Sequence, residues 1–525
     1  MKAIPRTLGA PFHAVRRRAA LGAAAAAACT AMVLGGFAVS AAQAAEPAAI
    51  DDIILLTGAD ESQRVVNWYA SASTAQVVQV APTNSIKKGQ FPANATVFPA
   101  VVSANTVNGG YNGHSVITGL SENVKYSYRV GGDGGWSEAH AFKTRKFDGN
   151  FDFLFFGDPQ IGSSGNVPKD QAGWEDTLEV AVGANPEAEL LVSGGDQVET
   201  ANVESQWTAF LAPEELRSVP WVATIGNHDV GGKAYEQHLW TPNTDRSPKH
   251  YRGNPAAQSG GDYWFTYKDV LFIDLNSNAY TASAEPGVDA DEAHIGYVSD
   301  VIAEHGDEAK YTVLVYHHSI YSPASHANDS DAQERRRDFP TAFSELGVDL
   351  VLQGHDHSYS RSYLIRNGEK ANPDEQPGAD SVFQGPGGVV YVTANSASGS
   401  KYYDLTAPRV GSDFGPDPLN PASHWANSVE DQEHVRSYVK VSVRDEHLQV
   451  ENIRSGTCAA PNAAVELGQE SWCGPDEGAS PAQPVGSVVD QVVIHRYDET
   501  RGPRGGATAP AVTTQQDDVT ITTID

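Results

Sequence analysis

The chain has 525 residues, 40% of them apolar, and a formal net charge of −30. This length exceeds one average domain and predicts two domains with extensions, while the apolar fraction excludes a disordered chain. The acidic balance argues against nucleic acid or an anionic membrane as the main partner.

Residues 1–44 have the features of an export signal. The arginines at 16–18 precede an alanine-rich run that ends in AQA at 42–44, a small-x-small cleavage pattern. RRAAL at 17–21 resembles a twin-arginine signal. A membrane anchor is the alternative, but the run is only weakly apolar. We therefore expect a secreted protein without a stable membrane anchor, more acidic by five charges once this segment is removed.

Residues 50–145 predict an all-β domain. Short strand patterns such as VVNWYA at 65–70 and AQVVQVAP at 75–82 are separated by glycine-rich turns. Strands of this length and spacing, without a helical stretch between them, indicate a small β-sandwich.

Residues 150–455 predict an α/β domain. Strongly apolar runs, beginning with FDFLFFGD at 151–158, alternate with helical spacing at 170–184, 290–305 and about 335–346. Buried strands that alternate with helices are typical of α/β folds. Two segments rich in Pro, Gly, Asp and Ser, 365–386 and 400–430, are expected to be long loops.

The C-terminal part contains the two cysteines of the mature chain. Residues 456–502 are expected to form an extension, and residues 503–525 a disordered tail. Export favours a disulfide between Cys458 and Cys473. Two free thiols or half of a metal site are the alternatives, although no further cysteine is available to complete a thiolate site.

Five apolar runs of the α/β domain end in residue types that bind metal ions. Taken singly, each ending has an ordinary explanation, because Gly-Asp after a strand is usually a turn or a helix cap. In α/β sheets, however, ligands bind outside the carboxyl ends of the strands, so five endings in order predict one shared site. The endings are GDPQ (157–160), GGDQ (194–197), GNHD (226–229), HHS (317–319) and GHDH (354–357).

These residue types suit two divalent cations held side by side. Carboxylate, imidazole and amide oxygen ligands favour Fe, Mn or Zn over Cu(I), which prefers sulfur ligands, and over Ca, which prefers oxygen ligands alone. Two such cations also offset the acidic charge of the chain where an anionic substrate would bind.

The ordered motifs resemble those of the calcineurin-like metallophosphoesterase superfamily. The front domain, with TGLSENVKYSYRVGG and WSEAHAFKT, resembles the fibronectin-like N-terminal domain of the purple acid phosphatases. The resemblance implies a metallophosphoesterase β-sandwich flanked by helices and preceded by a small all-β, fibronectin III-like sandwich. It also implies the metal ligands: Asp158 and His357 for metal 1, Asp196 as the bridge, and Asn227, His317 and His355 for metal 2.

The resemblance further implies that three histidines act near the substrate. His228 would stabilise the phosphoryl charge or protonate the leaving group. His317 is taken as the ligand in place of His318 because it lies four residues before Tyr321, as in the family pattern H-x-x-x-Y. His318 would then lie beside the ligands. His326 would contact the substrate, or else be a solvated loop histidine.

Two positions depart from the family. Purple acid phosphatases have a metal-binding Tyr three residues after the bridging Asp, where this chain has Glu199. Most of the superfamily has a His two residues after the first Asp, where this chain has Gln160. We therefore expect a divalent metal 1 without a purple phenolate-to-iron band. The amide oxygen of Gln160 would bind metal 1 or orient a metal-bound water, and a hydrogen bond to a ligand is the alternative.

The predicted activity is that of a secreted dinuclear-metal phosphoesterase, similar to acid phosphatases. It would hydrolyse small phosphomonoesters by attack of a metal-activated hydroxide. A phosphodiesterase or nucleotide hydrolase on the same site is the alternative, because the motifs leave the pocket undefined. A binding protein with a structural metal site would need an inactive centre, whereas His228 and all the core ligands are present. The sequence leaves the oligomeric state open.

Overall fold

The computed structural model describes residues 49–132, 134–282, 289–458, 460 and 484–496. The predicted export segment, the predicted tail and Cys473 lie outside the described residues. Cys458 is disulfide-bonded. Among the described helices, none combines the length and the apolar character that a membrane crossing needs.

The largest sheet runs through both the front region and the α/β region. Its outermost strands come from distant parts of the chain, and β-strands 10, 11 and 12 at its centre are parallel neighbours. In spatial order the strands are β20 (Ser381–Phe383), β25 (Val488–His495), β24 (His447–Arg454), β23 (Ser437–Val443), β10 (Phe151–Phe156), β11 (Leu190–Ser193), β12 (Trp221–Val222), β1 (Ile50–Thr57), β2 (Arg64–Ala70), β6 (Tyr111–Ile117) and β5 (Val101–Ala104).

A second mixed sheet belongs to the α/β region alone. Its order is β13 (Tyr263–Tyr267), β14 (Val270–Leu275), β15 (Tyr311–Tyr316), β16 (Leu350–Gln353), β21 (Val390–Thr393), β17 (Tyr359–Ser362) and β22 (Asn427–Asp431). A short hairpin joins β18 (Ile365–Arg366) to β19 (Glu369–Lys370).

The front region is all-β, as predicted. A separate small sheet contains β4 (Thr96–Pro99), β3 (Val77–Pro82), β7 (Lys125–Gly132) and β8 (Gly135–Trp136), with β9 (His140–Lys143) also paired to β7. Alternate residues of its strands, such as Val78 and Val80, pack against Trp68 and Val66 of the large sheet in one apolar core. In each of the two sheets, the residues that face this core are therefore spaced two apart along the strand.

Two of the three longest described helices begin at a residue whose side chain caps the helix. Asn166 accepts a hydrogen bond from the Lys169 amide at the start of α1, and Asp289 accepts one from the Glu292 amide at the start of α4. The helices are α1 (Val167–Ala184), α2 (Glu204–Phe210), α3 (Ala234–His238), α4 (Ala290–His305) and α5 (Ser330–Glu345), with 3-10 turns η1 (Thr83–Ser85), η2 (Glu214–Arg217), η3 (Pro248–His250) and η4 (Gly306–Glu308).

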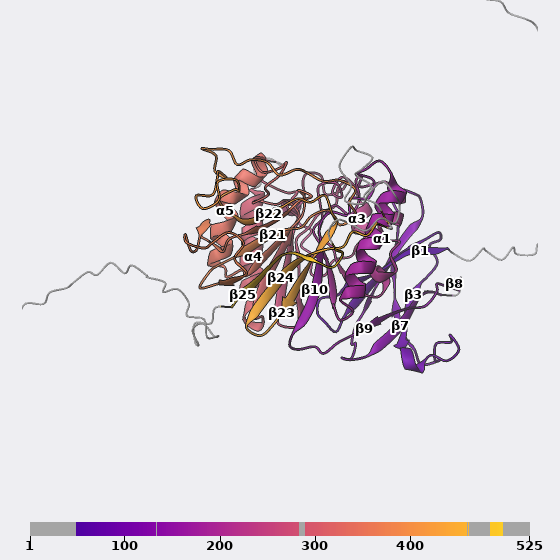
Figure 1. Ribbon diagram of the computed structural model, residues 1–525. Helices are drawn as coiled ribbons and strands as arrows, with labels where there is room; N and C mark the ends of the chain where they lie inside the picture. Colours follow the sequence, from indigo (N-terminus) through magenta and orange to yellow (C-terminus); the bar gives the residue numbers. More distant parts are fainter. Residues whose placement is uncertain (1–48, 133, 283–288, 459, 461–483, 497–525) are drawn as a thin grey trace, which may run out of the picture. The chain divides into compact units, whose positions relative to one another are not determined.

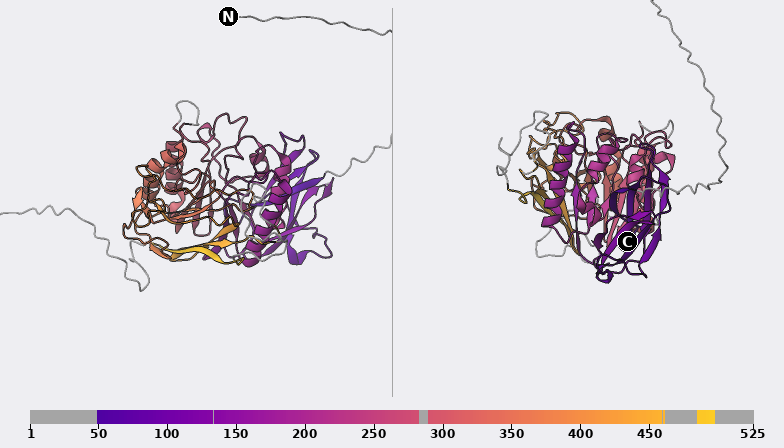
Figure 2. Two further views of the ribbon diagram at one scale, coloured as in Figure 1. Left: turned by 45° about the horizontal axis from the view of Figure 1, so that its top comes forward. Right: turned by 90° about the vertical axis from the view of Figure 1, so that its right-hand side faces the viewer.

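The two sheets pack face to face between helices. Phe153 and Phe155 of β10 lie in the same apolar core as Val313 and Val315 of β15 in the second sheet. The alternate residue Leu154 points the other way and joins the core beneath α1. On the far side, α4 and α5 cover the second sheet. Figure 2 shows the same arrangement from two other directions. The mixed α/β architecture predicted from the sequence is thus confirmed (Figure 1).

Two segments differ from their expected character. Within the predicted C-terminal extension, β25 pairs with β24 and buries Val492 and Ile494 in the core between the sheets. Within the predicted loop 365–386, β20 pairs with β25. The β-branched residues of VVDQVVIH at 488–495 are the sequence signal for this strand.

Candidate metal centre

The five polar motifs follow strands of both sheets. Asp158, Asp196 and Asn227 come after the parallel neighbours β10, β11 and β12 of the large sheet. His317 and His355 come after β15 and β16, which are parallel neighbours in the second sheet. Because the sheets face each other, the strand ends of both contribute to the single shared site that the sequence predicted.

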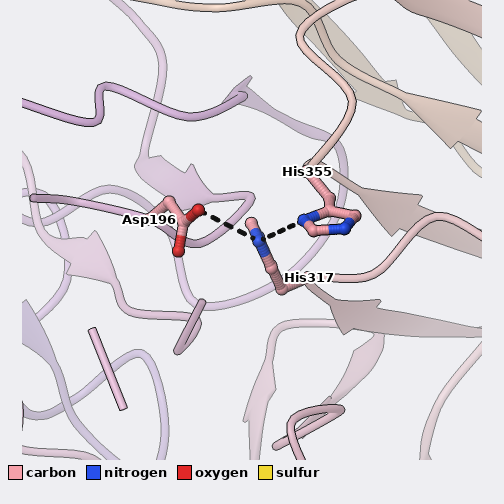
Figure 3. A group of neighbouring side chains, drawn as sticks. All are labelled: Asp196, His317 and His355. Atoms are coloured by element: carbon pink, nitrogen blue, oxygen red, sulfur yellow. Dashed lines mark hydrogen bonds and ion pairs between the residues drawn. The ribbon is translucent and has the colours of Figure 1, made fainter. Parts of the chain in front are cut away.

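Three ligand atoms, from the predicted bridge and the predicted metal-2 residues, converge on the ring of His317. Its Nε2 lies 3.3 Å from Asp196 Oδ2, 2.9 Å from Asn227 Oδ1 and 3.1 Å from His355 Nδ1. Figure 3 shows the His317 ring between Asp196 and His355. The donor atoms of Asp196, His317 and His355 all lie within 4.8 Å of one another. This spacing fits one cation with carboxylate, imidazole and amide ligands.

The predicted metal-1 residues lie beside this group. His357 Nε2 is 3.2 Å from Asp158 Oδ2, and the backbone N–H of His355 donates to Asp158 Oδ1 at 2.9 Å. The other ring nitrogens are oriented by carbonyls: His357 Nδ1 donates to Lys401 O at 2.9 Å, and His317 Nδ1 donates to Gly194 O at 2.8 Å. Metal-binding histidines are usually held in this way, which leaves Nε2 free for the ion.

The field of the site favours positive charge. Burial lowers the pKa of His317, but the carboxylates of Asp196 and Asp158 outweigh burial and raise it to about 10. Burial likewise raises the pKa of Asp196, yet the facing His317 holds it below its ordinary value. The buried carboxylates thus stabilise a cation at this point, whether a proton or a metal ion.

Four of the predicted ligands have left-handed backbone conformations. The φ angles are +35° at Gln160, +46° at Asp196, +77° at His355 and +43° at His357. Such angles are uncommon for residues other than glycine and gather where a fold holds functional side chains in fixed directions. The turns after β10, β11 and β16 therefore direct these side chains inward.

The motif glycines leave space for the ligands. A Cβ atom on Gly226 would lie 2.7 Å from Asp196 Cγ and closer still to Asp196 Oδ1. A Cβ on Gly195 would overlap the ring of His317, and one on Gly354 would overlap the carboxylate of Asp158. Glycine is needed at these positions because backbone and ligand approach too closely for any side chain.

Gln160 and Glu199 each have a buried oxygen without a hydrogen-bond partner among the described residues. Gln160 is 1% exposed, and its Oε1 has no hydrogen-bond partner among the described residues. Glu199 Oε2 is buried and equally unpartnered by hydrogen bonds within the described chain, although it lies 3.5 Å from His228 Nδ1. Since an unpaired buried oxygen costs free energy, both atoms suit a site completed by a cation or its water.

The three predicted substrate histidines have different surroundings. His228 is half-buried; its amide donates to Asp196 Oδ1 at 2.8 Å and its Nδ1 donates to Glu199 O at 2.8 Å. His318 packs on the rings of His317 and His355, and its Nδ1 lies 2.8 Å from Ser277 Oγ. Burial and the neighbouring charge of His317 hold the pKa of His318 well below its ordinary value.

His326 lies over the centre from a loop. Its ring centroid is 4.0 Å from that of His355, and its Nδ1 contacts Asp329 Oδ2 at 2.7 Å. Tyr403 contacts both His326 and His357, with ring centroids 5.4 Å from each. Tyr403 has no signal in the sequence, because it lies in a segment that has the composition of a long loop and contains no motif.

Asp229 ends the GNHD motif and joins two turns of the site. Its carboxylate accepts hydrogen bonds from the amides of Gly226 at 2.9 Å and Gln197 at 3.0 Å. Burial, followed by the charge of Asp196, raises its pKa well above the ordinary value. Asp229 thus ties the turn after β11 to the turn after β12, a role that the sequence did not predict.

Comparison with known proteins identifies both regions of the chain. Residues 151–359 match the model of the calcineurin-like phosphoesterases, and residues 51–144 match that of the purple acid phosphatase N-terminal domain. The larger match covers less than half of the chain and shows that the α/β region is similar to the calcineurin-like phosphoesterases.

Individual relatives are distant. A phosphoenolpyruvate phosphatase of Allium cepa is 22% identical over 272 residues, which are 49% of this chain and 52% of that protein. Purple acid phosphatase 18 of Arabidopsis thaliana is 26% identical over 266 residues, 50% of this chain and 55% of the relative. The chain thus matches about half the length of these curated relatives.

A solved structure shares the fold. The purple acid phosphatase PPD1 from yellow lupin seeds aligns with a TM-score of 0.61 and 18% identity, covering 86% of this chain and 75% of its own. This likeness concerns the fold alone, and the two departures at Gln160 and Glu199 are features of this chain.

Proposed function

We propose that this protein is a secreted, dinuclear-metal phosphatase that hydrolyses phosphomonoesters. The observation that carries the proposal is the convergence of carboxylate, amide and imidazole atoms on His317 Nε2, with the half-buried His228 beside them. The name of the Allium relative, a phosphoenolpyruvate phosphatase, supports a monoester substrate.

The residues fit two cations. Asp158, His357 and Gln160 would hold metal 1, and Asp196 would bridge to a metal 2 held by Asn227, His317 and His355. When bound, two such ions supply charge for the phosphoryl oxygens and lower the pKa of an attacking water. Because the neutral Gln160 and the carboxylate of Glu199 stand where relatives have His and Tyr, we propose a divalent metal 1.

His228 is suited to hold a proton for the leaving group. Its Nδ1 faces two acceptors, Glu199 O at 2.8 Å and Glu199 Oε2 at 3.5 Å. Both acceptors hold an N–H at Nδ1, because a carbonyl and a carboxylate accept hydrogen bonds and donate none. The opposite nitrogen, Nε2, is then the one that can take up a proton and give it to the departing oxygen.

The activity is tested with the full chain reconstituted with Mn²⁺, Zn²⁺ or Fe²⁺. We expect faster release of nitrophenol from p-nitrophenyl phosphate than from bis(p-nitrophenyl) phosphate. Asn227→Ala should lower the monoester rate by at least about 10²-fold. Removal of a residue that only supports a metal ligand already costs about 10- to 100-fold in metal affinity or activity, and Asn227 would be a ligand itself. The matched control is Asn254→Ala, at an exposed position in a loop.

Three outcomes would overturn parts of this proposal. A faster diester reaction would replace the monoester assignment with that of a phosphodiesterase. An Asn227→Ala rate equal to that of the control would refute the proposed site. An intense visible phenolate band in the metal-loaded protein would refute a divalent metal 1 without a tyrosine ligand.

Secretion is tested separately, in a bacterial host that has a twin-arginine pathway. The paired change R17K/R18K should leave the protein in the cytoplasm, while the unchanged chain is found outside it. Export of both forms to the same extent would contradict the twin-arginine assignment.

A further inference from the structure

A second buried cluster of metal-binding residue types lies outside the centre described above. His250 ends η3, Asp262 directly precedes β13, and His294 lies in α4. All three side chains are fully buried, with 0% exposure. One donor atom from each lies within 4.8 Å of the other two.

Both rings face the same carboxylate oxygen. His294 Nδ1 is 2.6 Å and His250 Nδ1 is 3.1 Å from Asp262 Oδ2. The other carboxylate oxygen, Asp262 Oδ1, accepts a hydrogen bond from the Asn276 amide at 2.9 Å. The three inner atoms therefore point at one another from three separate elements.

The outer nitrogen of each ring also lies beside a hydrogen-bond acceptor. His294 Nε2 is 2.8 Å from Ala279 O, and His250 Nε2 is 3.2 Å from Asp245 Oδ2. A carbonyl and a carboxylate accept hydrogen bonds but donate none. A neutral imidazole has one N–H, so each ring can satisfy its outer acceptor only by turning a bare Nδ1 lone pair toward Asp262.

The 2.6 Å approach of His294 Nδ1 is that of a hydrogen bond, so the uncompensated lone pair is that of His250 Nδ1, which repels the carboxylate unless positive charge lies between them. Two extra protons would supply that charge, at the cost of burying two imidazolium rings. A bound cation would supply the positive charge without protonating either ring. His250 Nδ1 has no hydrogen-bond partner among the described residues despite its 3.1 Å approach to Asp262, which argues against a shared proton there.

Two further features match a bound cation. Histidines that bind metals donate their other N–H to a carboxylate or a backbone carbonyl, as both rings do here. Tyr297 Oη is buried and has no hydrogen-bond partner in the described part of the chain, and its ring lies 5.5 Å from that of His250. A water on the cation would give this hydroxyl a partner.

We propose that His250, Asp262 and His294 bind a third divalent cation, separate from the dinuclear centre. Two imidazole nitrogens and one carboxylate oxygen favour Zn²⁺ over Ca²⁺ or Mg²⁺. The role of this ion is structural, because the site is closed to solvent by its full burial.

The third cation fixes one wall of the dinuclear centre. Asp262 and His294 hold the two ends of residues 276–279 through the Asn276 amide and the Ala279 carbonyl. Between them, Ser277 Oγ contacts His318 Nδ1 at 2.8 Å, and His318 packs against His355 at 4.6 Å between ring centroids. Loss of the ion would thus loosen the segment that supports His318.

The test is the metal content of the full chain grown with Zn²⁺ and measured by elemental analysis after gel filtration. We expect His294→Ala and Asp262→Asn each to bind one Zn²⁺ fewer than the unchanged protein. His305→Ala, on the same helix but outside the cluster, should match the unchanged protein. Equal zinc content in His294→Ala and His305→Ala would overturn the proposal.

Two further measurements separate this site from the dinuclear centre. Asp196→Asn should retain one tightly bound Zn²⁺ that His294→Ala/Asp196→Asn lacks, whether or not the proposed function is correct. If the cluster variants do not fold, anomalous scattering from zinc-grown crystals of the unchanged protein decides. A peak between His250, Asp262 and His294 is expected, and its absence would refute the third site.

Discussion

Replacement of Gly226 by alanine tests how tightly the fold positions the bridging carboxylate. The added Cβ would lie 2.7 Å from Asp196 Cγ, against an ordinary contact distance of 3.4 Å or more, and closer still to Oδ1 and the amide nitrogen. Asp196 must therefore move by about 1 Å, well beyond the ~0.2 Å tolerance of a metal–ligand bond. A misplacement of about 1 Å costs on the order of 10²-fold in rate, or about 2.7 kcal/mol of transition-state stabilisation.

The assay for Gly226→Ala combines monoester hydrolysis, metal content and urea unfolding. We expect the rate to fall ~100-fold with reduced metal content, while overpacking costs about 1–3 kcal/mol of stability. Gly296→Ala is the matched control, because it lies mid-way along α4, exposed, with no atom near its added Cβ. This control should keep full activity and gain up to about 1 kcal/mol. Unchanged rate and metal content in Gly226→Ala would show that Asp196 does not need its present position.

Three other substitutions test the site and the core. His228→Ala should lower monoester hydrolysis by about 10²–10⁴-fold with unchanged metal content, and loss of metal instead would make His228 a ligand. Gln160→Ala should remove metal 1 selectively and Gln160→Glu should retain it, whereas full metal occupancy in both variants would restrict Gln160 to a hydrogen bond. Burial raises the pKa of Asp349 to about 6. The folded chain therefore binds this proton more tightly than the unfolded chain, and stability falls as pH rises from about 4 to about 6. Asp349→Asn should accordingly be more stable than the unchanged protein by about 2 kcal/mol at pH 7 and equal to it near pH 4 in urea unfolding, since partial exposure reduces the full effect of about 3 kcal/mol. Equal stability at pH 7 would contradict this pH dependence.

The sequence was sufficient to predict the α/β class and the gathering of the five motifs. Alternation of buried strands and helices is a local property, and a polar residue after such a strand marks its carboxyl end. The side-by-side placement of Asp196 and His317 follows from that rule. Their actual environment, at the meeting edge of two facing sheets, depends on the pairing of strands from distant parts of the chain and has no local signal.

Other parts of the site required the structure. The left-handed backbone at Gln160 and His357 is set by packing around the turns, because neither residue type demands it. The histidine–aspartate cluster at His250 and His294 joins a 3-10 turn to a helix that lies more than forty residues later, without a recognisable spacing. Strand β25 was missed because its short run of β-branched residues does not alternate and follows a segment rich in Pro, Gly and Ser.

The parallel pairing of β1 with β12 has a consequence for any shortened form of the protein. Leu56 is the partner of Trp221, and the Thr266 amide donates to Ala59 O at 3.1 Å, so the front region closes the side of the phosphoesterase sheet. A truncated chain that began near residue 150 would leave β12 as an open strand edge beside the turn that carries Asn227 and His228, inviting pairing with another chain. The front region therefore covers the edge of β12 that would otherwise be open. A fragment without it would gain solubility from a charged residue or a proline at the exposed edge.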